Sequence, residues 1–214
     1  MSENKIEQGS PEWFAMKAGK FSSSRASDLM AKGKSGSPST SRRNLLAALA
    51  VERITGSYID SYHNGVMDRG NQVEPESRNA YSFQTMNAID EVAFLEHPTI
   101  KNCGCSPDGL VGADGVVEFK CPSSMARQFE ALTEHAHAKE HRWQAQFHLL
   151  VTGRAWCDVV SYDPRYPHGL RLAISRVNRD PDAIKELVGA MAIAEREIEA
   201  IISELQSIQE RAAS

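Results

Sequence analysis

A short stretch near the middle of the chain carries the side chains best suited to catalysis. Asp108 follows a turn proline, and Glu118 and Lys120 stand two residues apart further on. Side chains two apart on a strand share a face, so Glu118 and Lys120 should point the same way while Phe119 points into the packing. A hairpin would place Asp108 beside Glu118. Two carboxylates and a backbone carbonyl then form a hard-oxygen site suited to Mg²⁺ or Mn²⁺.

Lys120 adds a positive charge to this site. Its ammonium can position a water molecule and offset the negative charge that builds up on a phosphorus centre under attack. The pattern therefore predicts metal-assisted hydrolysis of a phosphodiester. The alternative interpretation is a surface hairpin with an ordinary cross-strand ion pair.

Glu74 is a further acidic candidate. It stands near an expected helix start, in Gly70-Asn-Gln-Val-Glu74, where a carboxylate could reach a metal ion or its bound water. Arg78 lies four residues further on, so the two could instead form an exposed i,i+4 ion pair worth a few tenths of a kcal/mol. The sequence leaves both interpretations open.

Three other features indicate structure more than chemistry. Residues 33–35 echo a phosphate-binding loop, but its leading glycine would fall at Asp28 and no apolar strand precedes it, which excludes a nucleotide site. The cysteine spacing fits no zinc motif and predicts small core residues at Cys103, Cys105, Cys121 and Cys157. Histidines in a polar helix–loop region are expected to be solvated: His135, His137 and His141.

The overall composition is that of a globular protein. A length of 214 residues suits one domain, 1–214, and 41 % hydrophobic with 24 % charged residues argues against a disordered chain. No apolar run approaches the roughly 18–20 residues that span a bilayer, and the first ten residues contain no apolar signal segment. Four cysteines are too few for a disulfide scaffold. We therefore expect a soluble, cytoplasmic protein without membrane association.

Charge is unevenly spread along the chain. Seven basic residues and one acidic residue lie between Lys17 and Arg43, a sum of +6, whereas the whole chain carries −4, so the remainder sums to −10. Such a segment can bind a polyanion, because the nearby field matters more than the net charge. The alternative is a solvated loop, since residues 32–41 are flexible by composition.

The elements that must position these side chains follow from hydrophobic spacing and turn residues. Helices are expected at 11–18, from 22–24 onward, and at 42–55, 71–86, 124–135, 139–151 and about 180–211. Strands are expected at 91–95, 103–105, 115–120, 155–162 and 170–177, with a hairpin turn at 107–114. This order predicts an α/β fold with a mixed central β-sheet flanked by helices.

Seven motifs occur in order along the chain: EQGSPEW at 7–13, SSS at 22–24, RG…E at 69–74, CSPDGL at 105–110, VEFKCP at 117–122, WQAQ at 143–146 and YDPR at 162–165. Through them the chain resembles the phage lambda exonuclease-like (YqaJ-type) recombination nucleases. That family belongs to the wider restriction-endonuclease-like PD-(D/E)xK fold.

The resemblance implies a Mg²⁺-dependent 5′→3′ exonuclease that digests one strand of linear duplex DNA. Its 3′ single-stranded product would serve a Red-beta-like single-strand annealing protein in phage-type homologous recombination. The protein would be phage or prophage encoded and would form a ring-shaped homotrimer. Two Mg²⁺ ions per active site are implied, with Mn²⁺ as a possible substitute.

The resemblance also implies roles for individual residues. Asp108, Glu118 and the carbonyl of Phe119 would bind the metals, Glu74 would assist through water, and Lys120 would orient the attacking water. The 5′-phosphate and the DNA would contact Lys17, Ser24, Arg25, Ser106, Gln144 and Gln146.

The sequence departs from the family pattern at two of these positions. Lys17 replaces the usual arginine of the phosphate pocket, and Pro75 directly follows Glu74. Two other functions stay open: a catalytically idle DNA-binding or scaffold subunit of the same fold, and a site-specific endonuclease.

Overall fold

The computed structural model describes residues 6–33, 38–59 and 65–213. The helices are α1 Pro11–Lys17, η1 Ser23–Arg25, α2 Ala26–Met30, α3 Thr40–Thr55, α4 Gly65–Thr85, α5 Met125–Glu134, α6 Ala136–Glu140, α7 Arg142–Thr152, η2 His168–Leu170 and α8 Pro181–Ala212. The strands are β1 Phe21–Ser22, β2 Ile89–Asp90, β3 Leu95–Glu96, β4 Cys103–Cys105, β5 Gly109–Val111, β6 Gly115–Lys120, β7 Trp156–Tyr162 and β8 Leu172–Asn178.

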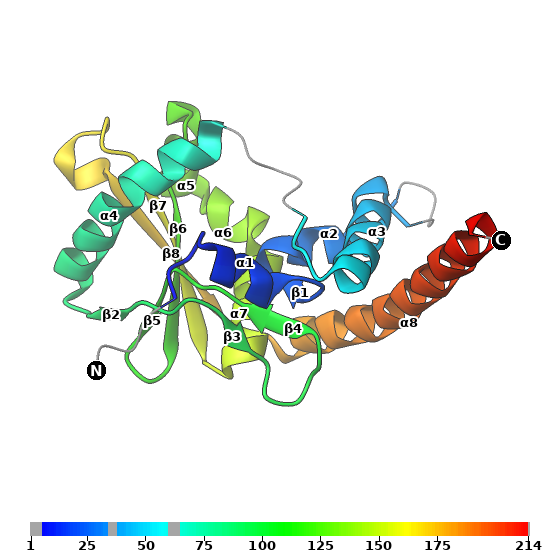
Figure 1. Ribbon diagram of the computed structural model, residues 1–214. Helices are drawn as coiled ribbons and strands as arrows, with labels where there is room; N and C mark the ends of the chain where they lie inside the picture. Colours follow the sequence, from blue (N-terminus) through cyan, green and yellow to red (C-terminus); the bar gives the residue numbers. More distant parts are fainter. Residues whose placement is uncertain (1–5, 34–37, 60–64, 214) are drawn as a thin grey trace, which may run out of the picture.

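A five-stranded sheet forms the centre of the molecule, in the order β2-β5-β6-β7-β8 (Figure 1). The β6–β7 pair is parallel and the other pairs are antiparallel, so the predicted mixed sheet is confirmed. Helix α4 packs on one face, where Tyr81 meets Val117, Phe119 and Val160. Helices α5, α6 and α7 pack against the other face.

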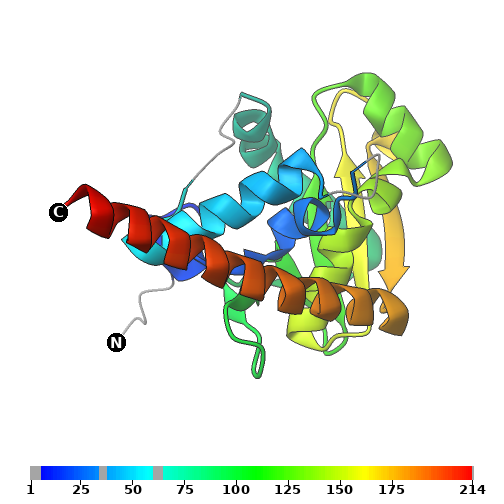
Figure 2. The same ribbon diagram turned by 90° about the vertical axis from the view of Figure 1, so that its right-hand side faces the viewer.

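The largest hydrophobic cluster lies beside this sheet. It joins α2, α3, α7 and the first half of α8 to the small sheet β1-β4-β3. Helix α8 runs alongside α3, and its C-terminal end projects beyond the rest of the molecule (Figure 2). Side chains at this end, including Leu205 and Ile208, are exposed, although the apolar stripe of the helix continues through them.

The helix ends agree with the signals in the sequence. Ser10 caps α1 by accepting a hydrogen bond from the amide of Trp13, and Pro11 occupies the first turn. Gly56 ends α3 in the left-handed conformation at φ 70°, as the sequence predicts. Asp180 caps α8 through two backbone amides. Local capping chemistry therefore fixes where these helices begin and end.

Several local predictions were wrong. Residues 91–95 do not form one strand, because β2 ends at Asp90 and β3 begins at Leu95. The segment 107–114 contains a further strand, β5, which pairs with β6, whereas β4 belongs to the small sheet. Cys103, Cys105 and Cys157 are buried as expected, but Cys121 is only half-buried.

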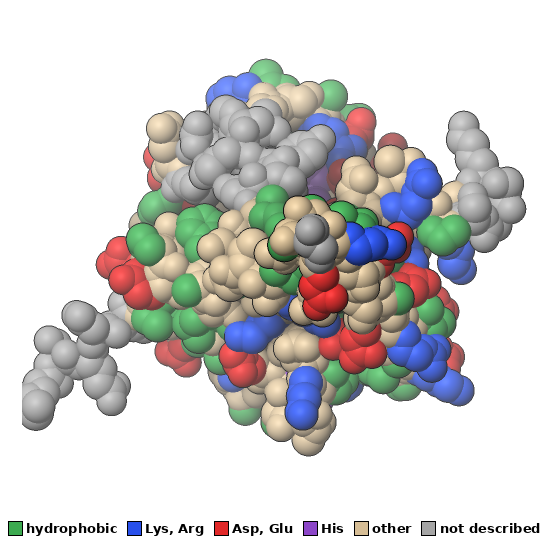
Figure 3. Space-filling model, turned by 45° about the vertical axis from the view of Figure 1, so that its right-hand side comes forward, with side chains coloured by type: hydrophobic (Ala, Val, Ile, Leu, Met, Phe, Trp, Pro, Cys, Tyr) green, Lys and Arg blue, Asp and Glu red, His purple; other side chains and the backbone are tan. Residues whose placement is uncertain are grey.

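Ion pairs neutralise much of the basic segment between residues 17 and 43. Lys20 pairs with Glu96, Arg25 with Glu52 and Arg42 with Glu197; the last two pairs have N–O distances of 2.6 and 2.7 Å. Figure 3 shows basic and acidic side chains interspersed over the face that it presents. Residues 34–37 of the expected 32–41 loop lie outside the described residues.

No helix within the described ranges is both long enough and apolar enough to cross a membrane.

Candidate active site

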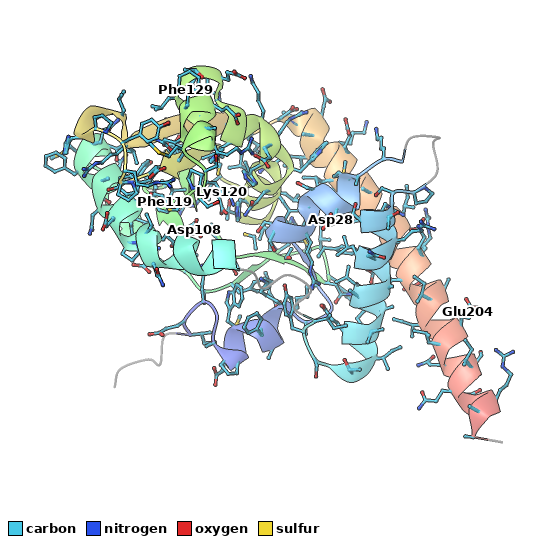
Figure 4. The ribbon with its side chains drawn as sticks, turned by 90° about the horizontal axis from the view of Figure 1, so that it is seen from above. Asp28, Asp108, Phe119, Lys120, Phe129 and Glu204 are labelled. Atoms are coloured by element: carbon cyan, nitrogen blue, oxygen red, sulfur yellow. The ribbon has the colours of Figure 1, made fainter. Side chains whose placement is uncertain are left out.

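The β5–β6 hairpin brings the two central carboxylates together. Gly109 pairs with Val117 in the register, so the preceding Asp108 lies next to Glu118. The backbone amide of Phe119 donates to Asp108 Oδ2 at 2.6 Å, which fixes this carboxylate beside the C-terminal end of β6. Figure 4 shows Asp108, Phe119 and Lys120 close together between α4 and α2.

Alternation along β6 separates the reactive side chains from the packing side chain. Phe119 faces α4, where its ring meets that of Tyr81 edge to face at 5.9 Å. Glu118 and Lys120 point to the opposite face, toward α7, and Lys120 Nζ donates to Glu118 Oε1 at 2.8 Å. The shared face predicted for Glu118 and Lys120 is confirmed.

Helix α7 supplies two further contacts to Glu118. Gln144 Nε2 donates to Glu118 Oε1 at 2.6 Å, and Gln144 Oε1 accepts from Lys120 Nζ at 3.1 Å. His148 Nε2 lies 2.9 Å from Glu118 Oε2. His148 is not among the residues predicted from the sequence, because a histidine inside an apolar helix resembles a core residue. Its spacing of four from Gln144, which places both on one side of the helix, is the signal that could have identified it.

Glu74 reaches the site through Arg78. The predicted i,i+4 ion pair exists, with Arg78 donating to Glu74 Oε1 at 2.7 Å. The same guanidinium also donates to the backbone carbonyl of Asp108 at 2.8 Å, so the pair is joined to the hairpin. Pro75 lies inside α4, and the helix continues past it to Thr85. Glu74 is therefore held beside the site and is not merely part of a solvent-exposed pair.

Electrostatics distinguish the three carboxylates. Burial raises the pKa of Asp108 well above its usual range, and the charges of Glu118 and Glu74 raise it further. Burial also raises the pKa of Glu74, against the opposing charge of Arg78. Burial would raise the pKa of Glu118 as well, but Lys120 and the hydrogen bond from His148 outweigh it and lower the value to about 2.

Lys120 responds in the opposite sense. Burial acts to lower the pKa of its ammonium, but the charge of Glu118 and the hydrogen bond to it have the larger combined effect and raise this pKa. Lys120 is therefore protonated at neutral pH, and it can act in this site as a hydrogen-bond donor and a positive charge.

A cavity of about 440 Å³ opens beside Lys120. Its lining residues are Ser24, Ser27, Lys120, Glu140, His141 and Gln144. A second cavity of about 260 Å³ shares Lys120, Glu140 and His141 and extends to Cys121 and Arg127. The prediction of solvated histidines was wrong for His137, which is buried. His141 is half-buried, and burial lowers its pKa to about 3.

The residues predicted to hold a 5′-phosphate lie in two groups, one lining the 440 Å³ cavity and one around Trp13. Ser24 and Gln144 line the 440 Å³ cavity. Ser106 and Lys17 meet instead at Trp13, whose indole Nε1 donates to Ser106 Oγ at 2.8 Å and whose ring lies 3.7 Å from Lys17 Nζ.

Two other predicted DNA contacts are engaged in structural bonds. Arg25 donates to both carboxylate oxygens of Glu52, at distances of 2.6 and 3.1 Å. Gln146 is 1 % exposed; it donates to the carbonyl of Asn178 and accepts from the amide of Asp180, which anchors the start of α8. In this structure the polar groups of Arg25 and Gln146 are therefore engaged by other parts of the fold.

The donor set suits a hard divalent cation. Within the described ranges, no three His, Cys, Asp or Glu side chains are arranged as a complete metal site. Mg²⁺ needs no such cage, because it typically uses one or two carboxylates together with water and substrate phosphate oxygens. Asp108 and Glu118 supply two carboxylates side by side. Burial, followed by the charges of Glu118 and Glu74, raises the pKa of Asp108, and a bound cation would favour the ionised form of this carboxyl. The residues present thus fit the cation.

Comparison with known proteins reveals clear relatives. Residues 12–155 match the profile of the YqaJ-like viral recombinase domain. The chain is similar to an alkaline exonuclease from Laribacter hongkongensis (LHK-Exo), at 36 % identity over 95 % of this chain and 100 % of that chain, with a TM-score of 0.84. The same enzyme in complex with dAMP gives a TM-score of 0.85. No match was found among curated proteins.

A more distant structure shares the fold. A phage-related exonuclease from Haemophilus somnus 129PT is 16 % identical over 87 % of this chain and 96 % of that chain, with a TM-score of 0.72. Together with the LHK-Exo match, this likeness confirms the predicted restriction-endonuclease-like fold.

Proposed function

Because the chain belongs to the family of YqaJ-like viral recombinase domains, we propose that it is a metal-dependent 5′→3′ exonuclease acting on duplex DNA ends. Its relationship to an alkaline exonuclease at 36 % identity makes it a nuclease. The observation that carries the finer proposal is the meeting of Asp108, Glu118 and Lys120 at one sheet edge, beside a 440 Å³ cavity.

Asp108, Glu118 and the carbonyl of Phe119 would hold the divalent cation, with Glu74 contributing through water. Mg²⁺ is the expected ion, Mn²⁺ is a substitute, and two ions per site are proposed. When bound, the cation would supply Lewis-acid stabilisation of the attacking and leaving oxygens. The chain itself supplies the positions of the oxygen donors, which the hairpin register and the Phe119 amide fix.

Lys120 would orient the attacking water and stabilise charge on the phosphate. Its ammonium is held between Glu118 and Gln144, at 2.8 and 3.1 Å. A protonated lysine cannot accept a proton, so in this role it donates hydrogen bonds and does not act as a general base.

The cavity lined by Ser24 and Gln144 would receive the 5′-phosphate of the strand being digested. Hydroxyl and amide groups donate hydrogen bonds to phosphate oxygens, and Lys120 adds a positive charge on the same wall. Lys17 and Ser106 would contact the same strand from the side of Trp13. This end-binding cavity favours an exonuclease over a site-specific endonuclease.

The further steps are part of the same proposal. The product would be a duplex with a 3′ single-stranded overhang, delivered to a Red-beta-like annealing protein in phage-type recombination. The active assembly would be a ring-shaped homotrimer built from a single nuclease domain, residues 1–214.

One digestion experiment tests the proposal. Linear duplexes with either a 5′-phosphate or a 5′-hydroxyl, labelled at either terminus, are incubated with Mg²⁺ or with EDTA. We expect Mg²⁺-dependent release of nucleotides from 5′ ends, faster with a 5′-phosphate, and no digestion of covalently closed circles. Release from 3′ ends would refute the polarity. Discrete cuts in closed circles would indicate an endonuclease. DNA binding without any cleavage would indicate a catalytically idle subunit.

A further inference from the structure

His148 is the one contact of Glu118 to which the proposed function assigns no role. It lies on α7 with none of its surface exposed, one helical turn after Gln144. Each oxygen of the Glu118 carboxylate has its own donor from this helix, with Gln144 Nε2 at 2.6 Å from Oε1 and His148 Nε2 at 2.9 Å from Oε2. The two donors on α7 therefore bond one oxygen each of the Glu118 carboxylate.

The partner of His148 fixes the position of its proton. An ionised carboxylate only accepts hydrogen bonds, so the proton must be on Nε2. Nδ1 is buried with no hydrogen-bond partner among the described residues. The bond to Glu118 is thus the one side-chain hydrogen bond of this imidazole within the described part of the chain.

Packing alone does not account for this histidine. A buried polar group that leaves one nitrogen unsatisfied costs free energy that a leucine at the same place would avoid. The neighbouring positions of α7, including Phe147 and Leu149, are apolar and fully buried. What the histidine provides, and a leucine lacks, is an N–H group directed at Glu118.

We propose that His148 is a positioning residue that fixes the orientation of Glu118 for the divalent cation. The inference rests on the proposed function, because it concerns the cation that this function requires. With both oxygens held from α7, rotation of the carboxylate is restricted, which would keep Glu118 in one orientation for the cation. Losing such a supporting contact typically lowers metal affinity or activity by about 10–100-fold.

Binding of Mn²⁺ without DNA tests this role directly. Free Mn²⁺ is measured by electron paramagnetic resonance for the wild-type protein and for His148→Leu, His148→Gln and His148→Asn. We expect the leucine variant to bind Mn²⁺ about 10–100-fold more weakly. The glutamine amide can extend to the place of the imidazole Nε2 and should restore affinity to within a few-fold. The asparagine side chain is too short to reach this place and should not restore Mn²⁺ affinity.

Gln128→Leu is the matched control. It removes an equally buried amide, which bonds Ser161 and the backbone carbonyls of Leu170 and Arg171 but not Glu118, and it should leave Mn²⁺ affinity unchanged. Wild-type affinity in His148→Leu, or an equal loss in Gln128→Leu, would overturn the inference. If the leucine variant does not fold, equal affinities of the glutamine and asparagine variants would overturn it.

The same assay separates the two proposals. If the wild-type protein neither binds Mn²⁺ nor digests linear DNA, the proposed function fails and the role of His148 fails with it. If the wild-type protein does both, but the His148 variants bind Mn²⁺ as tightly as the wild type, the proposed function is supported and the role of His148 is refuted.

Discussion

At the scale of single residues, Glu118 connects the charges of the site. Lys120, Gln144 and His148 all donate to its two oxygens. Burial would raise the pKa of Glu118, but Lys120 and His148 outweigh burial and lower it to about 2. The charge of Glu118 and its hydrogen bond with Lys120 raise the pKa of Lys120. The Glu118 carboxylate is therefore ionised and the Lys120 ammonium protonated over the whole neutral range. The carboxylate of Asp108 accepts a hydrogen bond from the Phe119 amide, but burial, followed by the charges of Glu118 and Glu74, raises its pKa.

Replacing Lys120 by alanine should abolish turnover and leave binding intact. The change removes the ammonium that faces Glu118 and Gln144, so we expect the single-turnover rate on labelled linear duplex to fall by about 100-fold or more. DNA binding in Ca²⁺ should persist. The exposed Lys185, on α8, provides the control Lys185→Ala. A near-normal rate in Lys120→Ala would show that the lysine has no catalytic role.

Replacing Asp108 by asparagine should stabilise the metal-free protein while destroying activity. A carboxyl whose pKa is raised on folding binds its proton more tightly when folded, so its contribution to stability is lost as the pH rises through that pKa. Asparagine is neutral at every pH and can still accept from the Phe119 amide. In EDTA, we expect the variant's Tm to exceed that of the wild type by about 2 °C or more at pH 8, with a smaller gain at pH 5.

The exposed Asp28 provides the comparison for this prediction. Asp28→Asn should change the Tm little at either pH, because its carboxylate is solvated. A lower Tm of Asp108→Asn at both pH values would mean that the carboxylate stabilises the fold, contrary to the repulsion inferred from its neighbours.

At the scale of elements, the hairpin and one helix assemble the site. Strands β5 and β6 bring Asp108 beside Glu118, and α7 covers the face of β6 that carries Glu118 and Lys120. The pairing of β5 depends on the absence of a side chain at Gly109. A Cβ there would lie 2.1 Å from Ile89 Cγ2 of β2 and 3.3 Å from Val117 Cγ1 of β6.

Gly109→Ala should therefore disturb both stability and activity. The added methyl group overpacks the junction of β2, β5 and β6, and we expect a loss of about 1–3 kcal/mol in the free energy of unfolding. Because Asp108 is the adjacent residue, nuclease activity should fall more than stability alone explains. Gly169→Ala is the control, since a Cβ at Gly169 meets no atom within 4 Å. Equal denaturant midpoints for the two variants would contradict the packing argument.

At the scale of the whole molecule, apolar packing holds the elements together. The largest core cluster joins α2, α3, α7 and α8, and apolar side chains hold the central sheet on both faces. We therefore expect the fold to form without the proposed cation. The likeness to LHK-Exo extends over 95 % of the chain, so this framework is shared well beyond the active-site motifs.

Chelation should accordingly remove activity and leave the protein folded. In EDTA we expect an unchanged far-ultraviolet circular dichroism spectrum and a single cooperative melting transition. Added Mg²⁺ should then raise the Tm, because a ligand that binds only the folded state stabilises it by about 2.7 kcal/mol at one hundred times its dissociation constant. Asp108→Asn should lose this rise. Unfolding of the wild-type protein in EDTA would instead mark the metal as structural.

The sequence by itself determined what depends on neighbours along the chain. The cap at Ser10, the left-handed Gly56 and the alternation of Glu118, Phe119 and Lys120 are set by backbone geometry within a few residues. The seven ordered motifs likewise predicted the family, and the turn-rich segment before β6 predicted the approach of Asp108 to Glu118.

Only the tertiary structure decided what depends on partners distant in sequence. His148 reads as a core residue until α7 packs against β6 and aims its Nε2 at Glu118. The bonds of Arg25 to Glu52 and of Gln146 to the residues before α8 likewise follow only from the tertiary structure. The type of a side chain determines which hydrogen bonds it can make. The packing of elements that are far apart in the sequence determines which partner it bonds.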